Sequence, residues 1–288
     1  MERIDLHTHS TCSDGSMTPA ELVCHAKESG LCAMALSDHD TVSGVDEAMA
    51  TGRELGIEVI PAIELSAVSA TETHILGYFI DPHAPELVHA LGRIRDIRVE
   101  RLTETCEMLR QHDIAVSMDE VRATAGGGVL CRAHIAKIMT EKGYAESPRD
   151  AFNRWLNVGC PCYSETQAIT DEEAIALIRS AGGDAYLAHL HLTKLPDDRL
   201  DAFVARLAAA GLHGLEGYYT DYTADMAEKY RVLAKKYHLA ISGGTDFHGS
   251  FKPHIAIGRG LGNMEIPYTV LAEMKKRHND THIRRENQ

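Results

Sequence analysis

Two histidines stand one residue apart in segment 3–9, which reads RIDLHTH. On a β-strand, successive side chains point to opposite faces, so His7 and His9 share one face and can bind one ion. On a helix with about 3.6 residues per turn, the same two side chains would point about 200° apart. The pair therefore favours a strand that ends at a binding site. The alternative is a polar N-terminal stretch with two solvated imidazoles.

Strand-like and helical segments alternate from residue 3 to residue 79. Four apolar segments fit strands, namely 3–7, 33–37, 57–66 and 74–79. A helix is expected to begin after Thr18, because Thr18 and Glu21 form a capping box and Pro19 occupies a position that a first helical turn tolerates. A second helix ends near Gly56. This βαβα alternation predicts a largely parallel sheet.

Consecutive helical segments replace this alternation between residues 85 and 182, where capping boxes begin at Ser117 and Thr170. Strand-like segments return at 184–190, 213–219 and 238–248. We therefore predict one α/β barrel domain, formed by 1–84 and 183–288, which is interrupted by a helical insertion at 85–182.

The composition limits the possible partners. Hydrophobic residues make up 44% of the 288 residues, which is typical of a globular chain, and the formal net charge is −13. Such a charge argues against binding duplex nucleic acid, which requires many Lys and Arg contacts to phosphate. A compact anionic substrate remains possible if metal ions hold it. The sequence contains neither an apolar run of about 18 residues nor a leader-like start, so we expect a cytoplasmic protein without membrane contact.

Residues of the kind that bind metals recur at the ends of the predicted strands. His7 and His9 end the first strand, His39 and Glu64 end the next two, and His74 begins the fourth. Further candidates are His134, His189, His191, Asp246 and His248. In a parallel barrel the C-terminal strand ends open on one face, where catalytic groups gather. Imidazole and carboxylate without thiolate suit manganese, iron(II) or zinc, and the set is large enough for two or three ions.

The order of these motifs resembles the PHP family of polymerase and histidinol phosphatase domains. The matching segments are HTH at 7–9, Asp14, SDHD at 37–40, IELS at 63–66, the histidine that begins the next strand, and TDFH at 245–248. The resemblance covers nearly the whole chain. It implies a distorted (β/α)7 barrel with a trinuclear metal centre, and phosphoesterase activity.

The resemblance also implies a role for each candidate ligand. It gives His7, His9, Glu64 and Asp246 to a first metal, Glu64, His74 and His134 to a second, and Asp14, His39 and His248 to a third. Glu64 would then bridge two ions, and manganese is the expected metal, with zinc or iron as alternatives. Because His134 lies in the insertion, the insertion is expected to fold over the barrel mouth and cover the active site.

Four other residues are candidates for supporting roles. In the segment AHLH at 188–191, many family members have a proline after the histidine, where this chain has Leu190. We therefore expect His189 to contact the metal ligands rather than to bind a metal itself. His191 is the candidate for contacting the substrate and protonating the leaving oxygen. Asp40 could orient His39 through its second ring nitrogen. Arg132 could bind phosphate bidentately, or it could be a surface residue of the insertion.

Among branches of the family, the segment CRAHIA at 131–136 and the insertion are most similar to enzymes that hydrolyse 3′,5′-nucleoside bisphosphates such as pAp. The expected reaction releases the 3′-phosphate and leaves a 5′-mononucleotide. The alternatives are a 5′–3′ exonuclease on short oligonucleotides, a histidinol phosphate phosphatase, and a non-catalytic domain that only binds metal. The expected partner is a small anionic nucleotide, or else a short oligonucleotide.

Overall fold

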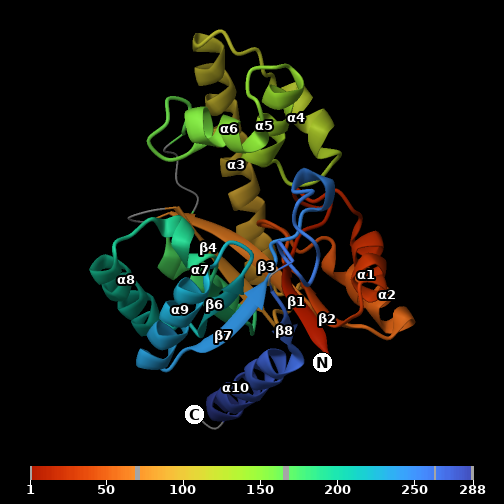
Figure 1. Cartoon of the computed structure of the whole chain (residues 1–288), viewed down its shortest axis with the longest axis vertical. Helices are drawn as coiled ribbons and strands as arrows, with labels where there is room; N and C mark the ends of the chain where they lie inside the picture. The colour runs from red at the N-terminus through yellow and green to blue at the C-terminus, as the bar shows by residue number, and fades with distance from the viewer. Residues whose placement is uncertain (1, 69–71, 165–168, 263, 287–288) are drawn as a thin grey trace.

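One sheet of eight strands curls into a barrel in the computed structural model, which describes residues 2–68, 72–164, 169–262 and 264–286 (Figure 1). The strands are β1 (Arg3–Thr8), β2 (Leu31–Leu36), β3 (Glu58–Val68), β4 (Glu72–Tyr78), β5 (Asp184–Leu187), β6 (Gly214–Tyr219), β7 (Ala240–Gly244) and β8 (Ile266–Pro267). Their order is β7-β6-β5-β4-β3-β2-β1-β8. A bridge between Thr8 and Phe247, just beyond β7, joins the two sides of the sheet. This arrangement confirms the predicted α/β barrel.

Strand β4 runs against its neighbours β3 and β5, whereas β1, β2 and β3 are parallel and so are β5, β6 and β7. The sequence predicted a largely parallel sheet and did not anticipate this reversal. Strand β3 ends at Val68 and β4 begins at Glu72, and so short a connection cannot cross back to start a parallel strand. The start of β4 therefore lies at the same rim as the ends of the parallel strands, and His74 pairs with Ser66 there.

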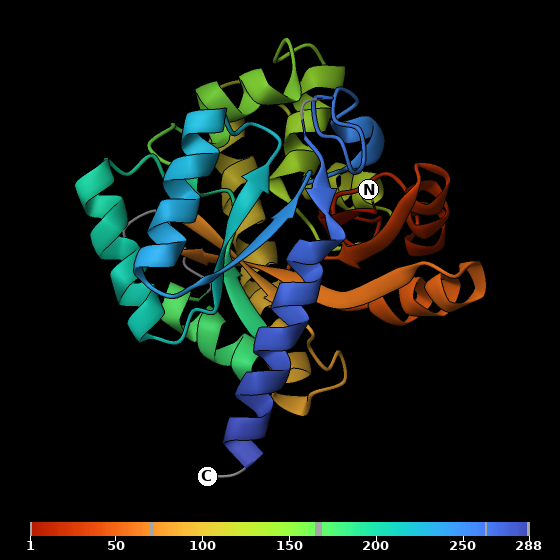
Figure 2. The same ribbon diagram turned by 60° about the horizontal axis from the view of Figure 1, so that its bottom comes forward.

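Helices cover the outside of the barrel. They are α1 (Pro19–Glu28), α2 (Val45–Leu55), α7 (Asp171–Ser180), α8 (Asp197–Ala209) and α9 (Ala224–Lys236), while α10 (Tyr268–Glu286) crosses the end opposite the insertion (Figure 2). The predicted capping boxes at Thr18, Ser117 and Thr170 are all present. No helix within the described ranges is long and apolar enough to cross a membrane.

Apolar and aromatic side chains fill the barrel below its mouth. Side chains at alternate positions of β4 share the inner face, so His74 at the mouth is followed by Leu76 and then Tyr78. Tyr78 is fully buried, its ring packs edge-on against Tyr186, and its hydroxyl donates to the Leu6 carbonyl. Most of the histidines and carboxylates described below lie above this packed layer, at the upper rim.

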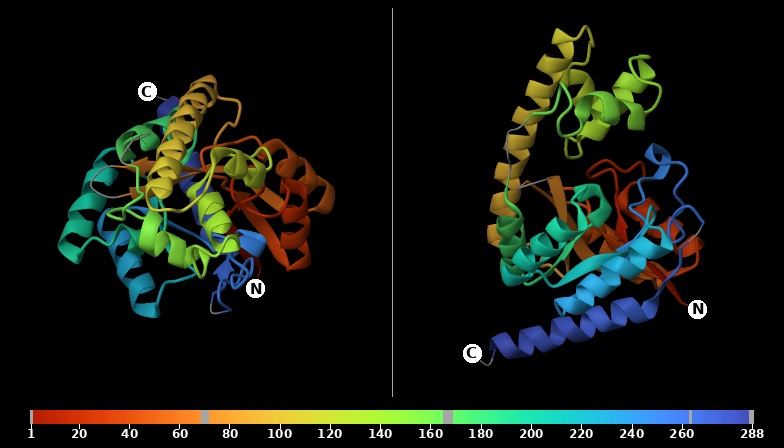
Figure 3. Two further views of the ribbon diagram at one scale, coloured as in Figure 1. Left: turned by 90° about the horizontal axis from the view of Figure 1, so that it is seen from above. Right: turned by 60° about the vertical axis from the view of Figure 1, so that its left-hand side comes forward.

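Helices α3 (Pro85–Gln111), α4 (Met118–Ala125), α5 (Arg132–Glu141) and α6 (Pro148–Ala151), with a π-helical turn at Phe152–Leu156, stand above that rim (Figure 3). The first turns of α3 pack in the hydrophobic cluster of the barrel, whereas its later turns pack in a separate cluster with α4 and α5. Helix α7 lies on the barrel, where Ile178 contacts Gly77. The exact division at residues 84 and 183 stays a prediction.

Candidate metal centre

Glu64 occupies the middle of the rim. It lies within β3 rather than at its end, and its side chain is completely buried. Five imidazole nitrogens lie 3.0–3.2 Å from its two carboxylate oxygens, those of His7, His9, His39, His74 and His189. One carboxylate thus faces ring nitrogens from strands β1 and β4 and from the loops after β1, β2 and β5.

Asp246 follows β7 and presents its two oxygens to different partners. Its Oδ1 lies 3.2 Å from His9 Nε2, 3.6 Å from His7 Nε2 and 3.4 Å from His248 Nδ1. Its Oδ2 accepts hydrogen bonds from Lys252 at 2.6 Å and from the Tyr219 hydroxyl at 2.9 Å. Oδ1 is therefore directed to the histidine cluster, whereas Oδ2 is held by Lys252 and Tyr219.

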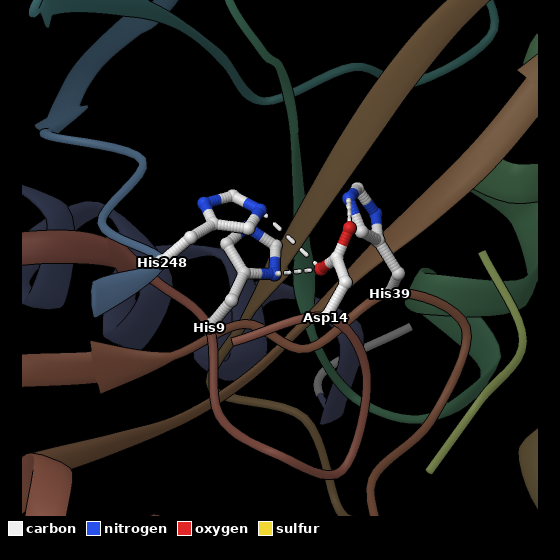
Figure 4. Close-up of side chains that lie close together, drawn as sticks. All are labelled: His9, Asp14, His39 and His248. Atoms are coloured by element: carbon white, nitrogen blue, oxygen red, sulfur yellow. Dashed lines mark ion pairs between the residues drawn. The ribbon is translucent and has the colours of Figure 1, made fainter. Parts of the chain in front are cut away.

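Asp14 gathers a further group of histidines from three separate loops (Figure 4). Its Oδ1 lies 3.3 Å from His248 Nε2 and 3.9 Å from His9 Nδ1, and its Oδ2 lies 3.9 Å from His39 Nε2. The three rings surround the carboxylate, although their residues are far apart in the sequence.

Among the described residues, three groups hold ligand atoms within 4.8 Å of one another. They are His7, His9, Glu64 and Asp246, then His9, Asp14, His39 and His248, and finally His39, Glu64 and His74. The first group is the set expected for the first metal, and the second contains the set expected for the third metal. His189 adjoins the last group, because its Nε2 lies 3.0 Å from Glu64 Oε1 and 3.2 Å from His74 Nδ1.

His134, which was expected beside Glu64 and His74, is in none of these groups. It lies on α5, where its Nδ1 accepts the Cys131 backbone N–H at 3.0 Å. His189 takes the expected place next to Glu64. Because Leu190 follows it, His189 was expected to contact the metal ligands rather than to be one, whereas in the structure its ring lies directly against the Glu64 carboxylate.

Several buried ring and carboxylate atoms in this cluster have no hydrogen-bond partner among the described residues. They are Nε2 of His7, both ring nitrogens of His9, Nδ1 of His39 and Oε2 of Glu64. Buried polar atoms without partners are costly, and buried lone pairs that converge are well suited to a cation. Imidazole and carboxylate ligands without thiolate fit a divalent ion such as manganese, iron(II) or zinc. The cluster therefore has the chemistry of a divalent metal site.

The carboxylates control the charge of the cluster. Burial would raise the pKa of Glu64, but the surrounding imidazoles hold it well below its usual range. Burial would lower the pKa of His9, yet the carboxylates of Asp246 and Glu64, each 3.2 Å from its Nε2, raise it to about 9. The carboxylates are thus ionised at neutral pH, and the negative charge attracts cations, whether protons or metal ions.

Glu216 of β6 supports the cluster from below and was not predicted from the sequence. It is fully buried, its Oε1 accepts from His7 Nδ1 at 2.9 Å, and its Oε2 accepts from the His189 backbone N–H at 2.7 Å. The first bond leaves His7 Nε2 to face the cluster, and the second holds His189 at a positive φ of 24°. The only sequence signal is an acid in the middle of the apolar segment 213–219.

Two buried aspartates shape the loops that carry the ligands. Asp38 accepts from Ser10 N at 2.7 Å and from Ser13 Oγ at 2.6 Å, which folds the loop that ends at Asp14. Asp5 accepts from Thr245 N at 2.9 Å and so fixes the residue before Asp246. Both ligand-bearing loops are therefore held by internal hydrogen bonds.

Asp40 does not orient His39, in contrast to the sequence expectation. Its φ of 50° turns the carboxylate toward β3, where Oδ1 accepts from Ser66 N at 2.9 Å and Oδ2 binds the Arg98 guanidinium. No hydrogen bond joins Asp40 to a histidine of the cluster within the described part of the chain. Arg98 also donates to Ser66 Oγ at 2.7 Å and to the Leu130 carbonyl at 3.2 Å, so Asp40 connects the rim to the insertion.

Arg132 and His191 lie near the mouth but make other contacts. Arg132 donates to the Leu156 carbonyl at 2.9 Å, and its guanidinium lies over the Tyr163 ring. The His191 ring packs against Tyr219 and a neighbouring tyrosine. Burial first, and then His189, lower the pKa of His191 to about 4, so the ring is neutral at pH 7, and its expected role as a proton donor stays a prediction. Their contact with substrate stays a prediction.

The barrel and its rim of imidazoles and carboxylates define a metal-dependent hydrolase of the α/β-barrel class. The PHP domain family matches residues 5–241, and the chain belongs to this family. This confirms the resemblance found in the motifs, and with it the phosphoesterase class of the protein.

Three relatives show how far the similarity extends. The chain is 32% identical over 267 residues to the 3′,5′-nucleoside bisphosphate phosphatase of Chromobacterium violaceum, covering 92% of each chain. It is 33% identical over 248 residues to the 5′-3′ exoribonuclease of Haemophilus influenzae, covering 86% of this chain and 90% of the relative. A solved amidohydrolase from Chromobacterium violaceum with bound sulfate superimposes with a TM-score of 0.82 at 32% identity, covering 86% of this chain and 88% of the other.

Proposed function

We propose that this protein removes the 3′-phosphate of 3′,5′-nucleoside bisphosphates and leaves a 5′-mononucleotide and phosphate. The observation that carries the proposal is the extent of the similarity to the bisphosphate phosphatase. The alignment covers 92% of both chains, so it includes the insertion over the mouth as well as the barrel. The insertion is the part of the molecule that differs most from a bare barrel and would contact the nucleoside.

The proposed cofactors are two or three divalent ions, with manganese favoured and zinc or iron as alternatives. The holders would be His7, His9, Asp14, His39, Glu64, His74, His189, Asp246 and His248. Bound ions of this kind lower the pKa of water and withdraw charge from phosphoryl oxygens. Three divalent charges would outweigh the three carboxylates of the set, and a phosphomonoester dianion complements the remaining positive charge.

The protein itself contributes orientation and enclosure. Glu216 and Asp38 fix the rings and the loop that carry the ligands. The insertion is tied to the rim through Arg98 and Asp40, so a substrate between them would be shielded from bulk water. Such enclosure favours a mononucleotide over a long polymer, which needs an open groove.

A second candidate is a 5′–3′ exonuclease that acts on short oligonucleotides. It is favoured by the similarity to the exoribonuclease, which covers 86% of this chain. The net charge of −13 works against it, because single-stranded nucleic acid is usually held in a basic groove. A non-catalytic domain has less support, since the described residues hold three groups of possible metal ligands at the rim. A histidinol phosphate phosphatase has less support because the two relatives reported above are named for the hydrolysis of nucleotides and RNA.

Phosphate release by the full-length, manganese-loaded protein would test the proposal. The substrates are adenosine 3′,5′-bisphosphate, adenosine 5′-phosphate, histidinol phosphate and a 5′-phosphorylated trinucleotide. We expect the bisphosphate to have the highest kcat/KM and to yield only adenosine 5′-phosphate, identified by chromatography. Faster cleavage of the trinucleotide would support the exonuclease, and turnover of histidinol phosphate alone would refute both nucleotide assignments.

A further inference from the structure

The hydrogen bond between Cys131 and His134 determines which ring nitrogen of His134 carries the proton. A backbone N–H can only donate, so His134 Nδ1 accepts the Cys131 N–H with its lone pair, at 3.0 Å. This contact is one half of a capping box at the start of α5, with His134 in the place usually taken by Glu or Gln. In the neutral ring the proton is therefore on Nε2. A protonated Nε2 cannot bind a metal ion, but it can donate a hydrogen bond.

The ring is held in a neutral state above the rim. His134 is buried, and burial first of all lowers its pKa, with Lys137 and Arg98 acting in the same direction and Asp14 against them. The opposing influence of Asp14 means that the ring lies within electrostatic reach of that rim carboxylate. The ring also packs edge-on against Phe251, with centroids 6.4 Å apart, and Phe251 comes three residues after His248.

The segment that leads into α5 is docked on the rim, which fixes the position of His134. Val129 N donates to the Cys12 carbonyl at 2.8 Å, in the loop between His9 and Asp14. Gly128 lies so close to this loop that a Cβ would stand 2.3 Å from the Thr11 carbonyl oxygen. The adjoining Leu130 carbonyl accepts from Arg98 at 3.2 Å. The entry to α5 is thus fixed at the mouth by contacts to both the barrel and α3.

We propose that His134 is not a metal ligand but donates an Nε2–H hydrogen bond to a phosphate oxygen of the bound substrate. The ligand is a phosphate ester, and its identity as a nucleoside bisphosphate rests on the proposed function. His189 already stands beside Glu64 and His74, so the cluster does not need His134 as a ligand. The insertion then contributes a substrate-binding residue to a metal centre that is built entirely from the barrel.

Two substitutions separate the capping role of His134 from the donor role. In His134→Gln, the amide oxygen can accept the Cys131 N–H and the amide nitrogen can still donate. In His134→Glu, the carboxylate can accept the same N–H but offers no donor at neutral pH. Glu120→Gln is the matched control, because Glu120 occupies the same position in the capping box of α4, which begins at Ser117.

The measurements are the metal content of each manganese-loaded protein and the affinity for inorganic phosphate, by calorimetry. We expect all three variants to keep the metal content of the wild type. Phosphate binding should weaken about tenfold or more in His134→Glu, change by at most about threefold in His134→Gln, and stay unchanged in the control. Loss of metal from either His134 variant, or unchanged phosphate affinity in His134→Glu, would overturn the proposal.

Nitrogen-15 NMR of the zinc-loaded wild-type protein provides a second measurement that does not depend on any variant folding. We expect the His134 ring to be protonated on Nε2 and that signal to shift when phosphate is added. A proton on Nδ1 instead would overturn the proposal. Because the probe is inorganic phosphate, these results stand even if adenosine 3′,5′-bisphosphate proves not to be the substrate.

Discussion

Lys252 Nζ lies 2.6 Å from Asp246 Oδ2, on the side of the carboxylate away from the ligand histidines. Burial would lower the pKa of Lys252, but Asp246 raises it above its ordinary value, so the side chain is an ammonium at neutral pH. About a third of the side chain, 35%, is still exposed at the mouth. Lys252 therefore brings a positive charge next to the cluster that an incoming phosphate can reach.

Replacing this ammonium should weaken substrate binding more than metal binding. In Lys252→Met we expect KM for the phosphorylated substrate to rise about tenfold, since a hydrogen bond to a charged group contributes roughly 1.5–3 kcal/mol. Metal content should be retained, because Asp246 Oδ1 still faces the histidines. Lys229→Met, which breaks an exposed pair between Lys229 of α9 and Asp197 of α8, is the control. An unchanged KM in Lys252→Met would contradict this role.

Glu216→Gln should lower metal affinity while leaving every ligand in place. The amide can accept one of the two hydrogen bonds of Glu216, but its NH2 group would then face the other donor, from His7 Nδ1 or from the His189 backbone. Loss of such a support typically costs 10–100-fold in metal affinity, about 1.4–2.7 kcal/mol. Competition against a chelating dye would measure the change, with exposed Glu228→Gln as the control. Equal affinities would show that Glu216 is dispensable.

The Arg98–Asp40 pair should be important for stability. Its side chains are 15% and 1% exposed, so Arg98→Met would leave a carboxylate buried without its partner, at a cost of about 3–5 kcal/mol. Urea unfolding of the metal-free protein would measure this loss. Arg95→Met, on the exposed face of the same helix, should change stability by less than about 0.5 kcal/mol.

A double-mutant cycle tests whether these two residues interact. The variant that combines Arg98→Met and Asp40→Asn should lose less stability than the sum of the two single variants, because it leaves no charge unpaired. Strict additivity would mean that the pair does not couple the insertion to the rim.

Metal uptake should release protons and strengthen as the pH rises. The pKa of His9 is about 9 in the metal-free protein against an ordinary 6.5, so its ring is protonated at pH 7 and must lose that proton to act as a ligand. The same shift stabilises the metal-free fold fully below about pH 6.5, and this stabilisation is lost as the pH approaches 9. Calorimetry in buffers of different ionisation enthalpy should detect about one released proton or more at pH 7. Heats that do not depend on the buffer would contradict the prediction.

Much of the barrel could be predicted from local patterns. Capping boxes depend on residues three positions apart, so Thr18 and Ser117 mark helix starts without knowledge of the fold. His7 and His9 share one face because they are two residues apart on a strand, and both contact Glu64 as expected. The family motifs then brought Asp14, His39, Asp246 and His248 to the same rim.

Contacts that depend on strand direction could not be predicted in this way. His74 reaches the rim because β4 runs antiparallel, a reversal that the periodicity of its side chains does not reveal. The choice between His134 and His189 depends on how a turn at positive φ aims one ring across the barrel. Glu216 belongs to no motif, and its importance follows only from its distance to His7.

The closure of β1 against the end of β7 also sets the order in which the site can form during synthesis. Thr245 and Asp5 are hydrogen-bonded although they are 240 positions apart. His7 and His9 are therefore synthesised long before Asp246 and His248. During synthesis these two histidines lack the other members of their ligand groups. A nascent chain that bound metal at this stage would hold it with an incomplete ligand set, so the full set exists only once the end of β7 has closed against β1.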